Sequence, residues 1–286
     1  MVAPTGFGHG VDFWSPYFQV WFWGVPLAYI VLSQLFRALG WWNFKLRTMK
    51  KGSLVDTSTR ASDDMAFEIV AGFCVTYLAA AGFICAFGLF GVDDYPKLAL
   101  NPYYGYSNFV RDHLVYPMLS YQGWNVFLSI FLDVLRDPFM IGHHIATGLL
   151  GYLGLHPYLH YRALFFFGMA EVTNIPLTVY DSCKKMGWKD GPLFAASQAT
   201  FAISFIIFRL ILWPIYSFQF WIDSYELLTT GKDKHSGKQT HSNLVVMIFV
   251  LSNLFLTFLQ FMWGKQVIVG LMGVLGLTKK SKSKSK

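Results

Sequence analysis

Long apolar stretches alternate with short polar connections along the whole chain. Seven such stretches have expected bounds of about 14–39, 66–92, 114–132, 138–155, 161–180, 192–222 and 243–264. A helix of about 20 apolar residues crosses the ~30 Å hydrocarbon layer of a bilayer. The pattern therefore predicts an all-α, polytopic transmembrane helical bundle of about seven spans. Nothing before the first stretch resembles the basic region of a cleavable signal, so we expect that span to be retained.

The same pattern divides the chain into three parts. Residues 1–62 hold the first transmembrane helix and a basic loop, 63–264 form a six-helix membrane domain, and 265–286 form a short helix and a lysine-rich tail. In the last part, Gly270, Gly273 and Gly276 are spaced three apart. The sequence leaves open whether 265–277 lies at the membrane interface or extends the last span.

Composition agrees with a membrane protein. The chain is 54% hydrophobic and 14% charged, whereas a soluble domain has nearer a quarter of charged residues. The net charge of +7 comes from loops and the tail, so we expect no nucleic-acid partner. The three cysteines show no spacing typical of a disulfide framework or a metal knuckle.

The distribution of basic residues predicts the orientation, because positive charge concentrates on the cytoplasmic side of the membrane. With the spans taken in turn, one side carries sixteen Lys and Arg and the other six, and Arg209 lies within a span. The larger group faces the cytoplasm if the N-terminus is lumenal and the C-terminus cytoplasmic.

The tail contains a further localisation signal. Lys282 and Lys284 are the fifth and third residues from the C-terminus, a spacing that resembles the dilysine signal for retrieval to the endoplasmic reticulum. The alternative is a basic tail attracted to anionic lipid. The predicted topology favours retrieval, because the tail lies where such a signal is read.

Polar residues at bilayer depth are costly and mark functional sites. The fourth stretch contains Asp137, His143 and His144. Asp137 and His144 are seven residues apart, about two helical turns, and share a face. We expect the carboxylate to orient the imidazole and favour its protonated form. The alternative is a pair of structural histidines that bond between helices.

The fifth stretch adds a second group of polar residues. Glu171, Asn174, Thr178 and Asp181 occupy one helical face, and Pro176 interrupts the backbone hydrogen bonds around Val172. A carboxylate beside a broken helix is a candidate site, and a buried Glu bonded to Asn or His is its structural alternative.

Two further stretches each carry polar residues at helical spacing, which places them on one face of a helix. One comprises Gln122, Asn125, Ser129 and Asp133, and the other comprises Asn253, Thr257 and Gln260. Packing between helices explains both. Arg209 either pairs with an interior carboxylate or extends to the interface. The positions of the histidines give no reason to expect a metal site.

The stretch from Asp137 to Leu150, above all His143-His144-Ile145-Ala146-Thr147, resembles the paired-histidine signature of the TLC-domain family. That family includes ceramide synthases, the translocating-chain-associating membrane protein and lipid-regulating proteins. The resemblance covers about residues 63–264. It implies a helical bundle with a lipid-accessible cavity in the endoplasmic reticulum membrane.

The ceramide synthases of this family pair the two histidines with a downstream His-Asp and a further Asp. Here the corresponding region reads Gly168-Met169-Ala170-Glu171-Val172-Thr173-Asn174-Ile175-Pro176. It is more similar to the non-synthase branch, whose members are tied to lipid composition and trafficking. Enzyme activity stays open, because Glu171 can act as a general base if desolvation raises its pKa.

The sequence thus predicts an endoplasmic reticulum protein that binds or regulates membrane lipids through an intramembrane cavity. The site candidates are His143, His144, Asp137, Glu171 and Asn174, with Gln122, Asn125, Asp133 and Asp181 in support. One alternative is an acyl-CoA-dependent N-acyltransferase of the ceramide synthase type, and another is an accessory protein for membrane insertion or trafficking. Membrane lipids are the expected partners, with acyl-CoA, a sphingolipid and a homodimer left open, and no cofactor is expected.

Overall fold

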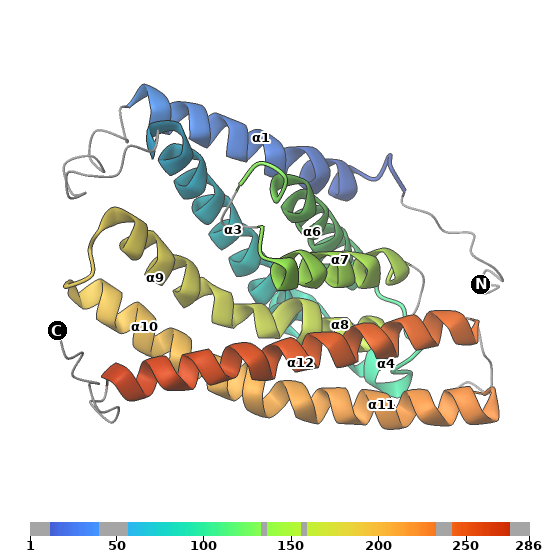
Figure 1. Ribbon diagram of the computed structural model, residues 1–286. Coiled ribbons are helices and arrows are strands. Elements are labelled where there is room, and N and C mark those ends of the chain that lie inside the picture. Colours follow the sequence, from blue (N-terminus) through green and yellow to red (C-terminus); the bar gives the residue numbers. More distant parts are fainter. Residues whose placement is uncertain (1–11, 40–56, 133–135, 156–158, 233–241, 275–286) are drawn as a thin grey trace.

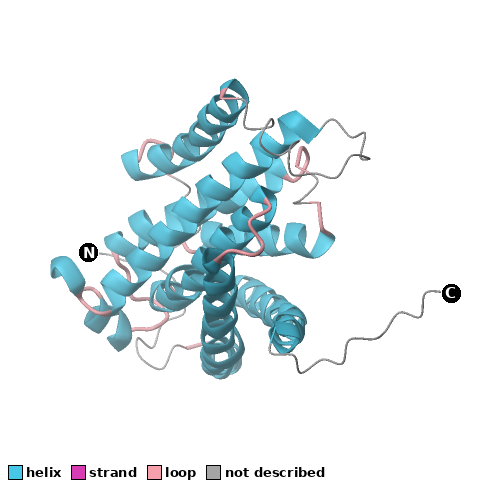
Figure 2. Ribbon diagram, turned by 90° about the vertical axis from the view of Figure 1, so that its left-hand side faces the viewer, coloured by secondary structure: helices cyan, strands magenta, loops and turns pink. Residues whose placement is uncertain are grey.

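A computed structural model describes residues 12–39, 57–132, 136–155, 159–232 and 242–274. Regular structure in these ranges is helical, with no strand (Figures 1 and 2). The long helices are α1 (Pro16–Ala38), α3 (Thr57–Ala86), α6 (Tyr116–Leu128), α7 (Pro138–Leu153), α9 (Asn174–Met186), α10 (Pro192–Phe205), α11 (Trp213–Thr230) and α12 (Asn243–Val274). The predicted all-α helical bundle is confirmed.

Short and irregular helices connect the long ones. They are η1 (Leu89–Gly91), α4 (Tyr95–Leu100), α5 (Asn108–Val110), the π-helix η2 (Arg111–Val115), α8 (His160–Ala163), the π-helix η4 (Leu164–Gly168), the 3₁₀-helix η5 (Met169–Thr173) and the π-helix η6 (Ile206–Leu212). Several run directly into long helices, so that His160–Met186 and Pro192–Thr230 each form one extended helical segment.

Five helical segments of the described chain are long and apolar enough to cross a membrane: Pro16–Ala38, Ser62–Ala86, His160–Met186, Pro192–Thr230 and Asn243–Met272. The third and fourth expected spans correspond to α6 and α7, which have 13 and 16 residues. At 1.5 Å per residue α7 is about 24 Å long, shorter than the hydrocarbon layer. The number of seven spans therefore stays a prediction. If α6 and α7 do not cross the membrane, an even number of spans is lost, so the two termini keep their predicted sides.

Helix α12 runs without interruption through Val274. The described residues after 264 thus continue the last span. Of the two alternatives left open by the sequence, this agrees with an extension of that span. The boundary expected at residue 264 falls inside this helix.

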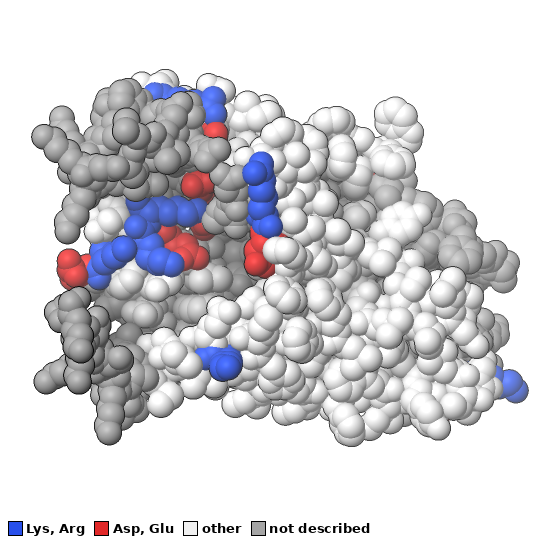
Figure 3. Space-filling model, in the orientation of Figure 1, with Lys and Arg blue, Asp and Glu red and all other residues white. Residues whose placement is uncertain are grey.

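Charged side chains gather at one end of the molecule, where α1 and α9 end and α3 begins (Figure 3). Ion pairs join the helices there: Arg37 lies 2.7 Å from Asp63, and Lys185 lies 2.6 Å from Glu68. The rest of the visible face is almost free of charge. This separation of charged end and apolar flank is what a protein embedded in a bilayer requires.

Helix α3 packs against the irregular segment η4–η5 through two glycines. A Cβ on Gly82 would lie 2.6 Å from the Cα of Gly168, and the reverse distance is also 2.6 Å. Only residues without a side chain allow the two backbones to come this close. This crossing fixes the position of the segment that carries Glu171.

Candidate functional site

An interior cavity of about 50 Å³ lies among the helices α7, α8, α11 and α12 and the irregular segments between them. Its polar lining residues are His143, Thr147, His160, Arg162, Glu171, Arg209 and Asn253. Apolar side chains, among them Leu150, Phe166 and Phe220, make up most of the remaining wall. The cavity therefore brings polar groups from four parts of the sequence into an apolar interior.

Helix α7 supplies one wall of the cavity. His143, Thr147 and Leu150 line it at spacings of four and three residues, which is one face of a helix. Pro138 occupies the first turn, where its missing N–H costs nothing. Asp137 is the N-cap, and its carboxylate accepts from the backbone N–H of Met140 at 3.0 Å.

The interaction expected between Asp137 and His144 is therefore wrong. Asp137 is exposed at the start of α7 and caps the helix, while His144 is buried and bonds to Gln122 of α6. Residues seven apart share a face but lie about 10 Å apart along the axis. The short carboxylate of Asp137 satisfies the nearest free backbone N–H instead.

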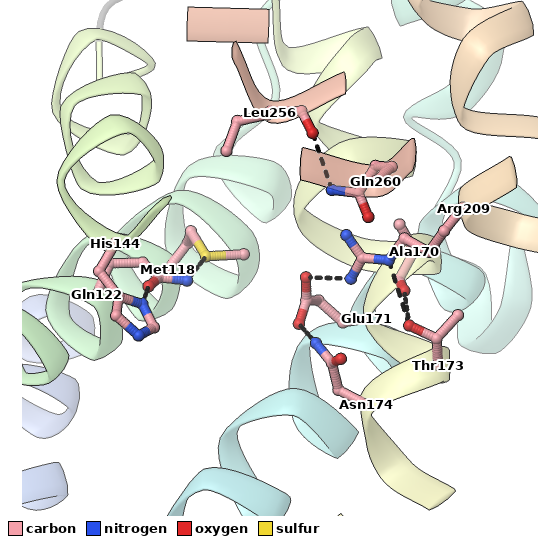
Figure 4. Close-up of polar contacts among 10 residues, drawn as sticks. All are labelled: Met118, Gln122, His144, Ala170, Glu171, Thr173, Asn174, Arg209, Leu256 and Gln260. Atoms are coloured by element: carbon pink, nitrogen blue, oxygen red, sulfur yellow. Dashed lines mark hydrogen bonds and ion pairs between the residues drawn. The ribbon is translucent and has the colours of Figure 1, made fainter. Parts of the chain in front are cut away.

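Gln122 fixes the orientation of the His144 ring (Figure 4). The amide nitrogen of Gln122 donates to the sulfur of Met118 at 3.2 Å, so its amide oxygen faces His144 Nδ1, at 2.5 Å. An amide oxygen only accepts, so in the neutral ring Nδ1 carries the hydrogen and Nε2 is left as an acceptor. His144 Nε2 is buried and has no hydrogen-bond partner among the described residues.

His143 points to a different side of α7 and lines the cavity. Its ring packs edge-on against Trp263 of α12, with centroids 5.6 Å apart, and against His144 at 5.3 Å. Its Nδ1 is buried and meets no hydrogen-bond partner in the described part of the chain. The two adjacent histidines thus have separate surroundings, and only His143 lines the cavity.

Glu171 and Arg209 form the polar centre of the opposite wall (Figure 4). Arg209 Nη2 lies 3.1 Å from Glu171 Oε1, and both side chains are buried. Arg209 Nε donates to the hydroxyl of Thr173 at 3.2 Å, and Asn174 donates to Glu171 Oε2 at 2.7 Å. Arg209 therefore pairs with an interior carboxylate, one of the two alternatives that the sequence left open.

Local backbone irregularity places Glu171 in this network. The π-helix η4 is followed by the 3₁₀-helix η5. A regular α-helix resumes at Asn174, two residues before Pro176. Because Pro176 cannot donate a backbone hydrogen bond, the helix starts anew there. The expected interruption around Val172 is confirmed.

Two further residues that the sequence had not singled out as site residues, His160 and Arg162, also line the cavity. His160 Nδ1 accepts from the Ser107 backbone N–H at 3.2 Å, and its Nε2 lies 2.9 Å from the Gly154 carbonyl oxygen, to which it donates. Arg162 lies 2.6 Å from Asp223 of α11. Only the folded chain shows these contacts, because the partners are distant in sequence or belong to a loop.

The remaining expected residues have other surroundings. Asn125 is buried in α6 but does not line the cavity. Asp181 lies 3.2 Å from Lys184 near the end of α9, also away from the cavity. Asp133, Lys282 and Lys284 fall outside the described residues. Within the described ranges no group of three or more His, Cys, Asp or Glu side chains could hold a metal ion.

The helical bundle, its apolar flanks and the polar cavity in its interior define a multi-pass membrane protein. Residues 67–269 match the family model described as the TLC domain. The chain belongs to the TLC-domain family, and the matched region includes the paired histidines, Glu171 and Arg209. No curated protein and no solved structure gives a significant match.

Proposed function

We propose that this protein holds a membrane lipid in its interior cavity and in this way binds or regulates lipids of the endoplasmic reticulum membrane. The observation that supports the proposal is the cavity itself, which combines an apolar wall with the polar groups of His143, Glu171 and Arg209. An amphipathic ligand needs both kinds of surface. Helices long and apolar enough to cross a membrane supply most of the wall, so the ligand reaches it from the bilayer.

The contacts of Glu171 support a binding role over acyl transfer. A general base must be free to take a proton from the substrate. Here both carboxylate oxygens are occupied, one by Arg209 and the other by Asn174. Since the downstream His-Asp pair of the ceramide synthases is also absent from the sequence, we place lipid binding before N-acyl transfer.

The proposed location follows from charge. Lys282 and Lys284 near the C-terminus would keep the protein in the endoplasmic reticulum, with the N-terminus in the lumen and the C-terminus in the cytoplasm. The excess of basic residues on one side of the predicted spans supports this orientation.

Mass spectrometry of the purified protein tests the proposed function. The protein is incubated with long-chain acyl-CoA, and both the intact chain and its extracted lipids are analysed beside a His143→Ala, His144→Ala double variant and Ala163→Phe. Ala163 lines the cavity, so its phenylalanine variant fills that space. Ala80→Phe is the matched control, because Ala80 is exposed on α3.

The expected result is an unmodified lipid that co-purifies with the wild type and Ala80→Phe but is lost in Ala163→Phe. An acyl adduct or amide product that disappears in the double histidine variant would overturn the proposal in favour of the N-acyltransferase. Equal lipid content in all variants would leave the cavity without a role in binding and favour an accessory protein.

A further inference from the structure

The charged groups of the cavity wall neutralise one another. Three charged residues line it, and each has an opposite partner: Arg162 pairs with Asp223 at 2.6 Å, and Arg209 pairs with Glu171 at 3.1 Å. Within the described residues the cavity thus offers no unpaired charge. A phosphate or ammonium group placed there would add net charge to an apolar interior, which is costly.

The groups that remain for a ligand are uncharged. Thr147 and Asn253 line the cavity and are 6% and 5% exposed, yet the hydroxyl of Thr147 and the amide oxygen of Asn253 have no hydrogen-bond partner in the described part of the protein. His143 Nδ1 is also buried and has no hydrogen-bond partner among the described residues. A buried polar atom without a partner is destabilising, so a ligand that bonds to these atoms removes that cost.

The chemistry of these atoms defines the ligand group. The amide oxygen of Asn253 only accepts a hydrogen bond, whereas the Thr147 hydroxyl both donates and accepts. A matching group must therefore carry at least one O–H or N–H donor. Thr147 on α7 and Asn253 on α12 both line the cavity, so a group held there faces polar atoms of two helices.

The size of the cavity agrees with a small polar group. Its volume is about 50 Å³, whereas a single water needs about 10–15 Å³ on the same scale. Apolar side chains such as Leu150, Phe166 and Leu256 form much of the surrounding wall. This space suits a headgroup of a few atoms attached to a hydrocarbon chain.

We propose that the cavity selects lipids whose headgroup is uncharged and carries a hydroxyl or amide donor, and that Thr147 and Asn253 recognise this donor. The proposal rests on the proposed lipid-binding function and specifies its ligand class. Hydroxyl and amide headgroups share the required chemistry, and the experiment separates them.

The test uses four lipids that have the same oleyl chain length and differ in their headgroup: oleyl alcohol, oleamide, oleyl phosphate and oleylamine. Each is incubated with the full-length protein in detergent, and the retained lipid is quantified by mass spectrometry. We expect the alcohol or the amide to be retained about tenfold more than either charged lipid, because each charged headgroup would add net charge to the apolar interior. A factor of ten corresponds to about 1.4 kcal/mol. The better ligand of the two identifies the donor.

Variants connect this selectivity to the two residues. Thr147→Val and Asn253→Leu each lower retention of the preferred lipid about tenfold and leave the charged lipids unchanged. Thr147→Ser keeps the hydroxyl without the methyl group and preserves retention, which shows that the hydroxyl and not the methyl group is recognised. Thr76→Val is the matched control, because Thr76 is exposed on α3.

Two results would overturn the selectivity: a charged lipid retained as well as the alcohol and the amide, or unchanged retention of the preferred lipid in both cavity variants. A different result would contradict lipid binding itself. In that case none of the four lipids exceeds the amount found with Ala163→Phe, whose cavity is filled.

Discussion

Arg209 lies 3.1 Å from Glu171, although the two residues are 38 positions apart in the chain and belong to different helices. Both side chains are buried, and Thr173 and Asn174 complete their hydrogen bonds. A buried charge that loses its partner is strongly destabilising, while loss of both charges is far less so. The pair therefore ties η5 to η6 and positions one wall of the cavity.

A double-mutant cycle measures this connection. We expect Glu171→Gln and Arg209→Met each to lower the free energy of unfolding by about 3–5 kcal/mol, and the double variant to lose much less than the sum. Thermal unfolding of the purified protein in detergent provides the comparison. The exposed pair Lys184 and Asp181 is the control, with an expected loss of at most ~1 kcal/mol. Strict additivity at Glu171 and Arg209 would show that the two residues do not interact.

The contact between Gln122 and His144 predicts a fixed tautomer of the buried ring. Nδ1 of His144 carries the hydrogen because it faces the amide oxygen of Gln122. In Gln122→Leu the ring loses this acceptor, and we expect a mixture of the two tautomers. Nitrogen and carbon chemical shifts of the imidazole report the tautomer directly. Gln266→Leu, at an exposed position of α12, is the control.

Two roles for the Asp137 carboxylate can be separated by experiment: the helix cap seen in the structure and the partner of His144 expected from the sequence. Asparagine caps a helix as well as aspartate does, so Asp137→Asn should leave the His144 tautomer and lipid retention unchanged. Asp137→Ala should cost about 1 kcal/mol of stability through loss of the cap. A changed tautomer in Asp137→Asn would restore a direct role for the carboxylate.

The glycine crossing predicts a strong response to a single methyl group. In Gly82→Ala the added Cβ meets the backbone of Gly168 at 2.6 Å, so the helices must separate at a cost of about 1–3 kcal/mol or more. Because η5 follows directly after Gly168, lipid retention should fall as well. Gly24→Ala and Gly123→Ala serve as controls, since nothing lies within 4 Å of a Cβ at either position. Equal melting temperatures for all three variants would contradict this packing.

The lysine-rich tail predicts a change of location. Replacement of Lys282 and Lys284 by serine should move the protein beyond the endoplasmic reticulum, because the spacing of the retrieval signal is lost. Fluorescence microscopy with compartment markers gives the result. Lys279→Ser with Lys280→Ser removes the same charge elsewhere in the tail and should leave the location unchanged. If both pairs behave alike, the tail acts only through its charge.

Much of the fold can be predicted from the sequence because apolar stretches of membrane length have one stable form. Helix α1 matches the first expected span within two residues. Helices α6 and α7 are different, because their apolar stretches include the turns at 129–131 and 154–155, and hydropathy does not detect where a helix ends. Span bounds therefore follow from composition, whereas helix ends depend on caps such as Asp137.

The site is less accessible to prediction than the fold. Helical spacing correctly groups Glu171 with Asn174, which bond to each other three residues apart. It cannot show that Arg209 is the partner of Glu171, since that contact depends on how two distant helices pack. The same spacing suggested Asp137 as a partner for His144, although a residue of another helix, Gln122, lies closer. Long-range contacts decide which polar residue meets which.

Photo-crosslinking with a lipid that carries a diazirine next to its headgroup and an alkyne at the end of its acyl chain for capture tests the central claim, binding of lipid inside the bundle. Peptide mapping should find crosslinks in the cavity-facing parts of α7 and α12, around Thr147 and Asn253, and these should disappear in Ala163→Phe and persist in Ala80→Phe. Crosslinks confined to outward-facing residues such as Phe218 and Tyr225, which are 60% and 71% exposed, and unaffected by Ala163→Phe would contradict it.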